Sequence, residues 1–286
     1  MHTAYGSSEL SSVQDHRIFY ANFIVKSAGA SDERLIAAFS TTEREHYLGD
    51  GPWSVFVNSS YISTVSADPR LLYQDIVVGL ATDRNINNGQ PTLHARCLAA
   101  CAPAIGDSVV QIGAGTGYYT AILAALVGDA GHVFAYEIEI DLAERARENV
   151  RHLPNVEVAA ASASEFALAS ADVIYVNAGA THPLPTWLDA LNVGGRLIFS
   201  LTPNQGIGVM LLVTRLASEE YAAHVLLPVM FIPCIGARDD ATSQALTTAI
   251  QTRSISAAKS LRRRTSPDAT ACCVGDDWWL SSKALT

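Results

Sequence analysis

The stretch VVQIGAGTGYYTAIL, residues 109–123, decides the fold. An apolar run at 109–112 ends in glycines at the alternating positions 113, 115 and 117, and a second apolar segment starts at Tyr118. Glycine lets the chain turn sharply and lets a ligand lie directly against the backbone. Open α/β sheets bind their ligands at such a turn, at the carboxyl end of a buried strand. A tight strand–helix turn without a ligand is the alternative.

Segments typical of strands and of helices alternate along the chain around this stretch. Strand patterns fall at 108–112, 132–137, 156–161, 172–178 and 195–202, with two more at 209–216 and 224–232. Helix patterns fall at 91–102, 118–127, 140–153 and 184–192. Strands that are apolar throughout and alternate with helices indicate a parallel sheet covered on both faces. The sequence therefore predicts an α/β, Rossmann-like fold with a mostly parallel sheet and helices on both faces.

The chain divides into three parts by pattern and charge. Residues 1–90 hold an N-terminal helical region at 17–45 and then an irregular region, residues 91–239 form the core, and residues 240–286 form a C-terminal extension. The extension has six Lys or Arg and four Asp or Glu, a net charge of +2, and subtracting it from the total of −9 leaves −11 for residues 1–239. Its LRRR run at 261–264 is expected to be a solvated face or a docking patch for an acidic partner. Its Trp278–Trp279 pair is expected to pack back on the body or to meet a partner.

Composition excludes several classes of protein. No run reaches the roughly 18 apolar residues of a membrane span, and the polar N-terminus lacks the basic-then-apolar form of a signal peptide, so we expect a cytoplasmic protein without a membrane partner. The net charge of −9 argues against a nucleic-acid partner. The five cysteines show no C-x-x-C spacing and the eight histidines no H-x-x-x-H pair, so no metal site is predicted. Cys97 and Cys101 are expected to be small buried side chains.

The strand after the glycine turn ends in an acid, Glu137, which lies 20 residues beyond Gly117. A carboxylate at that place can accept hydrogen bonds from both hydroxyls of a ribose. The turn itself is G-x-G-x-G, whereas the dinucleotide fingerprint is G-x-G-x-x-G with a later third glycine. The combination is similar to the loop of S-adenosylmethionine-dependent methyltransferases, whose cofactor is a nucleoside without a pyrophosphate.

With these residues in place, the chain resembles the protein-L-isoaspartate O-methyltransferase family. The resemblance covers roughly residues 15–237 and lies in several segments in order: DERLIAAFSTTEREHYL, YQDIVVGLATDRNINNGQPTLHARCL, the glycine turn with the following strand, DVIYVNAGATHPLPTWLDALNVGGRLIFSLTPN and LLPVMFIPCIG. It implies S-adenosylmethionine as the cofactor and carboxyl methylation as the reaction, with a role in the repair of isoaspartyl proteins. It places the cofactor on Gly113, Ala114, Gly115, Thr116, Gly117, Tyr118, Glu137 and Ser162, and the acceptor near Gly89, Gln90, His94 and Asn177.

The chain departs from the family pattern at two of these positions. Gly89 stands where the family usually has Ser or Thr before Gln-Pro, and the resemblance implies that the missing hydroxyl helps to hold the acceptor carboxylate. We therefore expect weak activity, or none, on simple isoaspartyl peptides and a gain in Gly89→Ser, unless Gln90 or Asn88 supplies the contact. Ala161, Ser162 and Ala163 replace a Gly-Asp-Gly, so a hydroxyl stands where the adenine amino group normally meets a carboxylate, a stronger acceptor.

Several candidate side chains have a second interpretation. His94 is either an acceptor contact or a packing residue of the helix that Pro91 opens, and Asn177 either touches the acceptor or the cofactor carboxylate or does neither. One of Tyr118 and Tyr119 covers the cofactor or packs in the core. Asp75 either holds the acceptor loop or is an ordinary turn acid.

Three functions remain on the sequence alone. The first is carboxyl methylation of an isoaspartyl or related carboxylate in a peptide or protein acceptor. The second is methylation of a different acceptor, such as a modified peptide or small molecule, in a dedicated pathway. The third is a binding protein that keeps the cofactor fold without catalysis. In each case the extension offers a protein partner or self-association.

Overall fold

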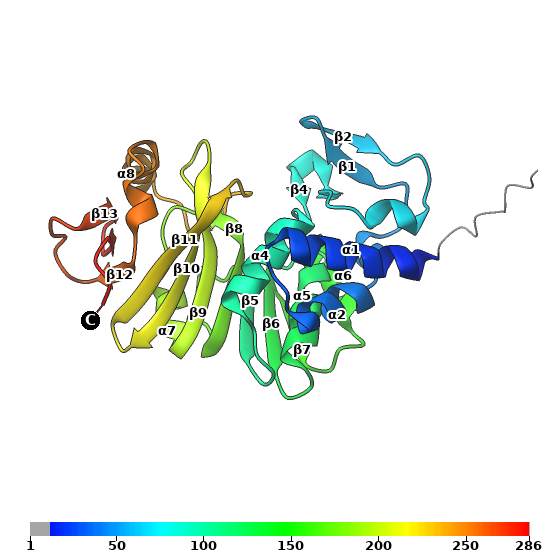
Figure 1. Ribbon diagram of the computed structural model, residues 1–286, viewed down its shortest axis with the longest axis horizontal. Coiled ribbons are helices and arrows are strands. Elements are labelled where there is room, and N and C mark those ends of the chain that lie inside the picture. Colours follow the sequence, from blue (N-terminus) through cyan, green and yellow to red (C-terminus); the bar gives the residue numbers. More distant parts are fainter. Residues whose placement is uncertain (1–11, 286) are drawn as a thin grey trace, which may run out of the picture.

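The computed structural model describes residues 12–285, so the N-terminal segment tested for a leader lies largely outside it. Its centre is a ten-stranded sheet in the order β13-β14-β12-β11-β10-β9-β8-β5-β6-β7 (Figure 1). The strands of this sheet are β5 (Ser108–Ile112), β6 (His132–Glu137), β7 (Val156–Ala160), β8 (Ala171–Ala180), β9 (Leu191–Leu201), β10 (Gly208–Ala217), β11 (Glu220–Val229), β12 (Ser260–Arg263), β13 (Ala271–Val274) and β14 (Trp278–Ser281). Two small sheets pair β1 (Ser54–Val57) with β2 (Ser60–Ser63) and β3 (Gly79–Ala81) with β4 (Ile86–Asn87).

The described helices precede, connect and follow the strands of the large sheet. The α-helices are α1 (Val13–Ser27), α2 (Glu33–Thr41), α3 (Arg44–Leu48), α4 (Pro91–Cys101), α5 (Tyr118–Val127), α6 (Ile140–Val150), α7 (Pro185–Ala190) and α8 (Asp240–Gln251). The short 3-10 helices are η1 (Pro69–Leu72), η2 (Thr82–Arg84) and η3 (Ser254–Ala257). Pro91 opens α4 as predicted, because proline lacks only a donor that the first helical turn leaves unused.

The α/β fold predicted from the alternating pattern is confirmed, and its parallel part is the half that carries the glycine turn. β9, β8, β5, β6 and β7 pair in parallel. From β9 outward through β10, β11, β12, β14 and β13 the pairing is antiparallel, so the sheet as a whole is mixed. Apolar runs alone could not distinguish these two arrangements, because buried strands of both kinds carry similar residues.

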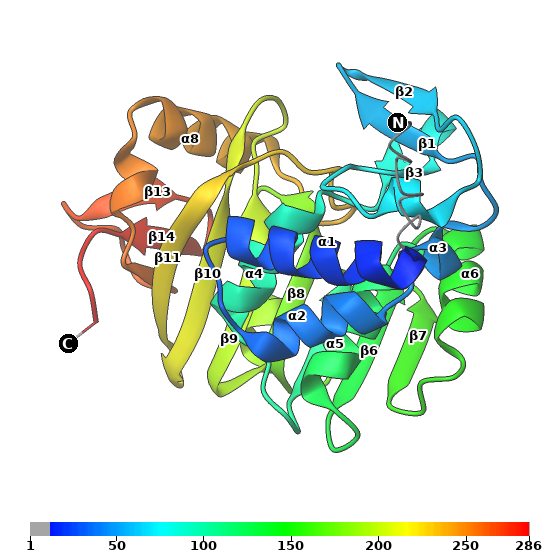
Figure 2. The same cartoon turned by 45° about the vertical axis from the view of Figure 1, so that its right-hand side comes forward.

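Helices cover both faces of the sheet, and each face has its own apolar core. One core joins α1, α2, α4 and α5 to the sheet, around Tyr20, Phe39, Leu98 and Ile122. Figure 2 shows these helices lying across one face of the strands. The other core lies under α7 and α8, around Trp187, Phe199 and Leu246. No helix among residues 12–285 is long and apolar enough to cross a membrane.

The C-terminal extension is built into the sheet. β12 pairs with β11, with Leu261 opposite Tyr221, and β14 and β13 follow it. Trp278 and Trp279 are 3% and 4% exposed, so the pair packs back on the body. The 261–264 run is not a continuous solvated face, because Leu261 and Arg263 are buried and Arg263 is ion-paired with Asp189 at 2.5 Å, whereas Arg264 is exposed. A strand pattern explains this, since alternate residues of a strand point to opposite faces.

Candidate active site

A single cavity of about 970 Å³ lies at the carboxyl ends of the parallel strands. One wall is the glycine turn, the end of β6 and residues 161–164. The facing wall is the segment from Arg84 to His94, with Phe56, Tyr61 and Leu80 nearby, and residues 227–235 close a third side. The carboxyl ends of neighbouring parallel strands meet at one edge, which is how residues distant in sequence come together here.

The glycine turn has the backbone that only glycine adopts readily. The φ angles of Gly113, Gly115 and Gly117 are +81°, +56° and +95°, in the left-handed region that strains other residues. The turn is tied to the neighbouring strand, because the N–H groups of Gly113 and Ala114 both donate to the Tyr136 carbonyl, at 2.8 and 3.1 Å. A Cβ on Gly115 would lie 3.0 Å from Leu80 Cδ1, across the cavity wall.

Glu137 presents a fixed carboxylate beside this turn. Its Oε2 accepts the Gly115 N–H at 2.7 Å and its Oε1 accepts the Glu139 N–H at 3.0 Å. Burial raises the pKa of Glu137, and the backbone donors partly oppose that rise by stabilising the ionised form. The side chain is 6% exposed and borders the cavity. Each oxygen keeps a further lone pair for a hydroxyl, which is what a ribose requires.

Asn177 stands on β8 opposite the turn. Its Nδ2 donates to the Gly113 carbonyl at 3.1 Å, and this bond fixes the direction of the amide. Its Oδ1 is buried without a hydrogen-bond partner, which is costly for a polar atom. A ligand group that donates a hydrogen bond here would remove the cost. The orphaned oxygen, the bare glycine backbone and the Glu137 carboxylate together fit an aminoacyl nucleoside such as S-adenosylmethionine.

The remaining predicted cofactor residues also border the cavity. Thr116 is buried at the end of the turn, and its carbonyl accepts from Asn149 at 2.9 Å. Ser162 Oγ is hydrogen-bonded to Ser164 Oγ at 2.7 Å, on the side where β7 ends. Tyr118 differs, because its ring is 2% exposed and its hydroxyl contacts Tyr20 at 3.3 Å. The ring is thus a core side chain, although the residue lines the cavity.

The predicted acceptor residues lie on the facing wall and are anchored by Asp75. Gln90 Nε2 donates to Asp75 Oδ2 and the Thr92 N–H donates to Asp75 Oδ1, both at 2.8 Å. Gly89 has φ +70°, and its N–H donates to Asn87 Oδ1 at 2.9 Å. Asp75 therefore holds the acceptor loop to the start of α4, the first of the two interpretations that the sequence left open.

His94 is buried in the same wall and 3% exposed. Its Nδ1 lies 2.9 Å from the Tyr175 hydroxyl, and its ring stacks on Tyr119 with centroids 3.7 Å apart. Burial, and then the positive charge of Arg44, lower the pKa of His94 to about 3, so the ring is neutral at physiological pH. A Cβ on Gly89 would overlap His94 Nε2. The gain expected from Gly89→Ser stays a prediction, and this geometry argues against it, because a side chain at position 89 would meet the imidazole.

A buried cation, Arg44, supports this loop, and no pattern in the sequence indicated it. The Arg44 guanidinium donates to the carbonyls of Leu72, Gln74 and Ile76, on either side of Asp75. It lies over the rings of Tyr20 and Tyr118, within 5.9 Å of each centroid. An arginine that leads a short helix is usually a surface residue, and its burial follows only from tertiary packing.

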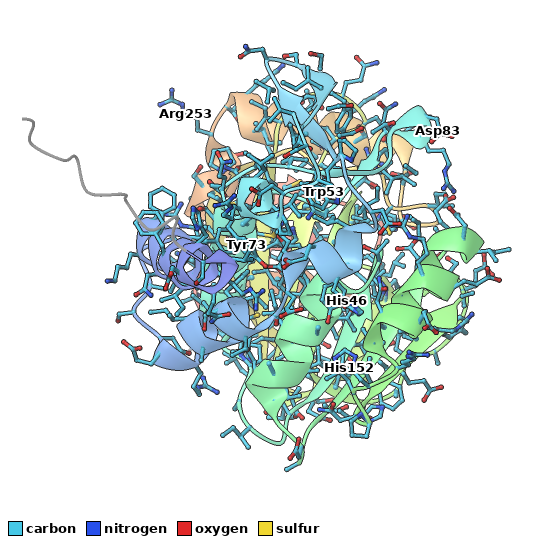
Figure 3. All side chains as sticks on the ribbon, turned by 90° about the vertical axis from the view of Figure 1, so that its right-hand side faces the viewer. His46, Trp53, Tyr73, Asp83, His152 and Arg253 are labelled. Carbon is cyan, nitrogen blue, oxygen red and sulfur yellow. The ribbon has the colours of Figure 1, made fainter. Side chains whose placement is uncertain are left out.

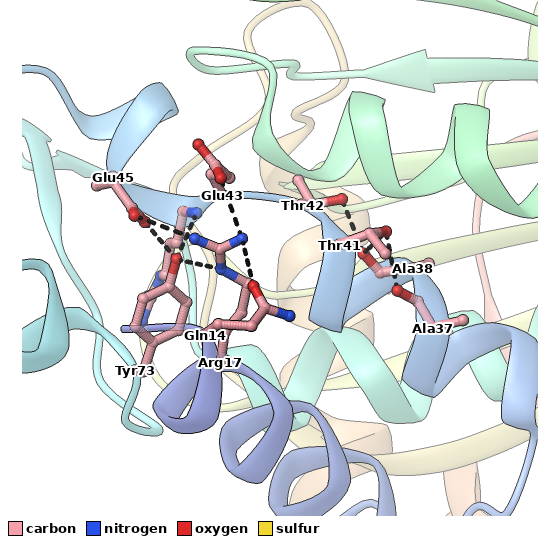
Figure 4. Close-up of polar contacts among 10 residues, drawn as sticks. Gln14, Arg17, Ala37, Ala38, Thr41, Thr42, Glu43, Glu45 and Tyr73 are labelled. Carbon is pink, nitrogen blue, oxygen red and sulfur yellow. Dashed lines mark hydrogen bonds and ion pairs between the residues drawn. The ribbon is translucent and has the colours of Figure 1, made fainter. Parts of the chain in front are cut away.

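A second cluster fixes the same segment to α1 (Figure 4). Arg17 Nε donates to the Tyr73 hydroxyl at 2.9 Å, and its other nitrogens contact Glu43 and Glu45. The hydroxyl of Tyr73 in turn donates to Glu45. Figure 3 shows His46 near His152, where α3 meets the end of α6, and His46 Nε2 lies 3.0 Å from the Asn149 carbonyl. The N-terminal helices thus brace both walls of the cavity.

The ion pairs that connect the two walls of the cavity were not predicted from the sequence. Arg84, on η2, contacts Glu139 and Asp141 at the start of α6, with a 2.6 Å separation between Arg84 Nη2 and Asp141 Oδ2. The pairs join residues more than 50 positions apart beside the Glu137 carboxylate. Charges of opposite sign at 84 and 139–141 were visible in the sequence, but nothing in their spacing connected them.

With this geometry described, comparison with known proteins identifies the family. The sequence profile of the family described as protein-L-isoaspartate(D-aspartate) O-methyltransferase (PCMT) matches residues 23–239, most of the chain. The chain belongs to the protein-L-isoaspartate O-methyltransferase family. It is therefore an S-adenosylmethionine-dependent methyltransferase, and the cofactor and fold expected from the resemblance are confirmed.

Individual relatives agree with this assignment. The protein-L-isoaspartate O-methyltransferase of Ignicoccus hospitalis is 33% identical over 58% of this chain and 79% of the relative. That of Brucella anthropi is 30% identical over 73% of this chain and 88% of the relative. A Plasmodium falciparum structure described as a putative family member in complex with S-adenosyl-L-homocysteine has a TM-score of 0.62 at 18% identity, covering 77% of this chain and 98% of that one.

The likeness in fold extends into the C-terminal extension. A solved protein-L-isoaspartate O-methyltransferase has a TM-score of 0.63 at 22% identity and covers 93% of this chain and 88% of that one. Such a share leaves only about 20 of the 286 residues outside, fewer than the extension contains. Part of residues 240–286 therefore has a counterpart in the fold of that structure, although the resemblance in sequence covers roughly residues 15–237.

Proposed function

We propose that this protein methylates the free α-carboxylate of an isoaspartyl residue in a peptide or protein, and that the acceptor binds on the wall formed by Gly89, Gln90 and His94. One observation carries the proposal: a single cavity joins the Glu137–glycine wall to the wall that Asp75 anchors. Donor and acceptor can therefore meet without a further rearrangement of the chain.

Methyl transfer requires alignment of the donor and the acceptor more than it requires a general acid or base. S-adenosylmethionine supplies a methyl group already activated on a sulfonium sulfur. An acceptor carboxylate is ionised at neutral pH, so no side chain has to remove a proton. Holding the attacking oxygen in line with the methyl carbon and the sulfur is worth about 7–11 kcal/mol. The protein's part is to fix the two ligands and to exclude water from between them.

Each wall has a distinct task in this proposal. Glu137 holds the ribose and Gly115 leaves room for it, while Asn177 Oδ1 accepts from an amino group of the cofactor. Gly113, Ala114, Thr116 and Gly117 keep the turn in shape, and the Ser162 hydroxyl meets the adenine edge. Aromatic residues Phe56 and Tyr61 line the outer part of the cavity and suit an extended peptide entering from solvent.

Transfer of labelled methyl groups tests the proposal directly. The substrates are an isoaspartyl peptide, its aspartyl twin and a pool of cell extract. We expect label on the isoaspartyl peptide alone, as a base-labile ester. Label only on a component of the extract would support the second function, a different acceptor in a dedicated pathway. Tight binding of the cofactor product with no transfer to any of them would support the non-catalytic alternative.

We also propose that a partner or a second copy of the chain binds at the C-terminal extension, but at a smaller surface than the sequence suggested. Both tryptophans are occupied by intramolecular packing. A partner would therefore meet β13, the outermost strand at that edge of the sheet. Size-exclusion chromatography with light scattering would detect self-association there.

A further inference from the structure

We propose that His94 Nε2–H is the hydrogen-bond donor that receives the acceptor's carboxylate oxygen, in the space that a side chain at position 89 would otherwise occupy. This assignment rests on the function proposed above and names the group that selects the acceptor. In this assignment Gly89 and His94 act together, because the absence of a side chain at position 89 leaves space for the His94 imidazole.

The first argument is the position of Nε2. His94 lines the cavity, and its Nε2 is the atom that a Cβ built on Gly89 would overlap. That nitrogen has no partner within residues 12–285, yet it is not among the buried unpaired atoms of this region. It is therefore open to the cavity, although the ring around it is buried.

The second argument concerns which ring nitrogen carries the proton. Nδ1 faces the Tyr175 hydroxyl at 2.9 Å, and the Cys97 thiol also lies close to that hydroxyl. A buried phenol proton needs an acceptor, and an imidazole nitrogen is a far better one than a thiol sulfur. Tyr175 therefore donates to Nδ1, and the single proton of the neutral ring sits on Nε2, where it faces the cavity.

The third argument is that the alternative donors of this wall are engaged elsewhere. The Gln90 amide donates to Asp75. Asn88 is 8% exposed, its Oδ1 accepts the Val78 N–H, and its Nδ2 is buried away from solvent. Neither side chain can turn to the acceptor without breaking the loop. The hydroxyls of Thr92 and Tyr119, residues that also line the cavity, have no partner among the described residues but are buried. His94 Nε2 is the donor open to the cavity, and with it we expect isoaspartyl turnover in the wild-type enzyme despite the missing hydroxyl.

Stacking keeps the donor in place. The ring of Tyr119 lies against the imidazole at an interplanar angle of 19°, and Phe231 approaches its edge with centroids 6.3 Å apart. A donor that is already oriented loses little entropy when the acceptor arrives. Because the ring stays neutral, it binds an anionic oxygen by a directed hydrogen bond and adds no net charge to the site.

The experiment is a small set of variants assayed for methyl transfer to an isoaspartyl peptide, with calorimetry of S-adenosylhomocysteine as the test of an intact fold and cofactor site. We expect His94→Ala to lower kcat/KM roughly tenfold to a hundredfold, the loss typical of a hydrogen bond to a charged group, mostly through KM, with cofactor-product affinity unchanged. His94→Gln, which places an amide N–H near the same point, should keep more activity. Tyr175→Phe should also lose activity, since it frees the proton to move to Nδ1.

The decisive comparison pairs Gly89 with His94. Gly89→Ser alone should lower kcat/KM because the new side chain meets the imidazole. In the His94→Ala background the space is free, so Gly89→Ser should recover activity relative to the matched control Gly89→Ala/His94→Ala, which has the same backbone strain but no hydroxyl. Wild-type activity in His94→Ala, or a gain from Gly89→Ser alone, would overturn the assignment and leave the proposed function standing. A wild-type enzyme that binds S-adenosylhomocysteine but never methylates isoaspartyl peptides would overturn both.

Discussion

The Asp75 carboxylate caps α4 from 17 residues away, accepting the N–H of Thr92 at 2.8 Å. A cap normally comes from the residue just before the helix, but here that residue is Gln90, whose own side chain makes no cap and instead donates to Asp75. One carboxylate thus fixes both the start of the helix and the loop that forms the proposed acceptor wall.

Asp75→Ala should therefore weaken acceptor binding while leaving the cofactor wall intact. We expect a several-fold rise in KM for the peptide, unchanged affinity for S-adenosylhomocysteine, and a loss of about 1 kcal/mol in the free energy of unfolding, as for other lost caps. Asp83→Ala is the matched control, because Asp83 is exposed at the outer edge of the molecule (Figure 3) and its side chain makes no hydrogen bond or ion pair among residues 12–285. Equal effects of the two substitutions on KM would contradict the role given to Asp75.

Glu137→Ala should weaken cofactor binding by about 1–3 kcal/mol, because two ribose hydroxyls would lose their acceptor. Glu137→Gln tests the charge of this side chain at nearly constant size. It keeps one oxygen, but its NH2 group would face the N–H of Gly115 or Glu139. Calorimetry with S-adenosylhomocysteine measures both. Unchanged affinity in Glu137→Ala would remove this residue from the site.

The same carboxylate predicts a pH dependence of binding. Burial raises the pKa of Glu137 above its ordinary value of 4.5, so in the window just above that value the folded free enzyme holds a proton that the unfolded chain has released. Its contribution to stability is therefore present below the window and is lost as the pH rises through it. Ribose hydroxyls favour the ionised form, so cofactor affinity should rise with pH across the same window, and Glu137→Gln should abolish the change.

Gly115→Val should abolish cofactor binding without unfolding the protein. Valine resists a φ of +56°, and its Cβ would approach Leu80 Cδ1. Gly106→Val is the control, because Gly106 also has a positive φ, +89°, but a Cβ there meets nothing within 4 Å. Both variants should lose similar stability in denaturant titrations, and only Gly115→Val should lose the cofactor. Normal binding by Gly115→Val would reduce the turn to a structural element.

Arg84→Ala should speed cofactor release more than it lowers stability. The Arg84 pairs with Glu139 and Asp141 are partly exposed, and such pairs contribute about 0.2–1 kcal/mol each. Because they bridge the two walls beside Glu137, we expect a faster dissociation of S-adenosylhomocysteine in stopped-flow measurements and a similar change in wild type at high salt. Arg151→Ala, which breaks the exposed pair with Glu148 on α6 and its C-cap, is the control. Identical release rates in both variants would count against the bridge.

Much of the fold could be predicted from the sequence, because the patterns that indicate it lie within short segments of the chain. The glycine turn, the apolar strands and the proline at 91 each predict a backbone state on their own, and β5, β6 and α5 lie where those patterns placed them. The antiparallel half of the sheet did not follow, because pairing direction is set by connection and partner rather than by composition. The extension looked like a separate tail because its strands are short and interrupted by polar turns.

The candidate site could be predicted from the sequence less completely than the fold, because several of its residues are brought together only by tertiary packing. Gly113 and Glu137 could be assigned from spacing, because strand ends fix both. The link between Gly89 and His94 could not, because it depends on the volume between a loop and a helix. Arg44, Arg84 and Tyr175 act through contacts with distant segments, and no pattern along the chain records such contacts.

Pairing of β12 with β11 has a consequence for how the enzyme is made. The strands that carry the cofactor turn are synthesised before β12, the strand that shields β11. Until it emerges, the growing chain exposes an open sheet edge that invites association with other chains. A chain cut short after residue 239 would keep every residue of the cavity and still present that raw edge. With residues 240–286 in place, the outermost strand at this edge is the four-residue β13 instead of the ten-residue β11, so fewer unpaired backbone groups are left for another chain to pair with.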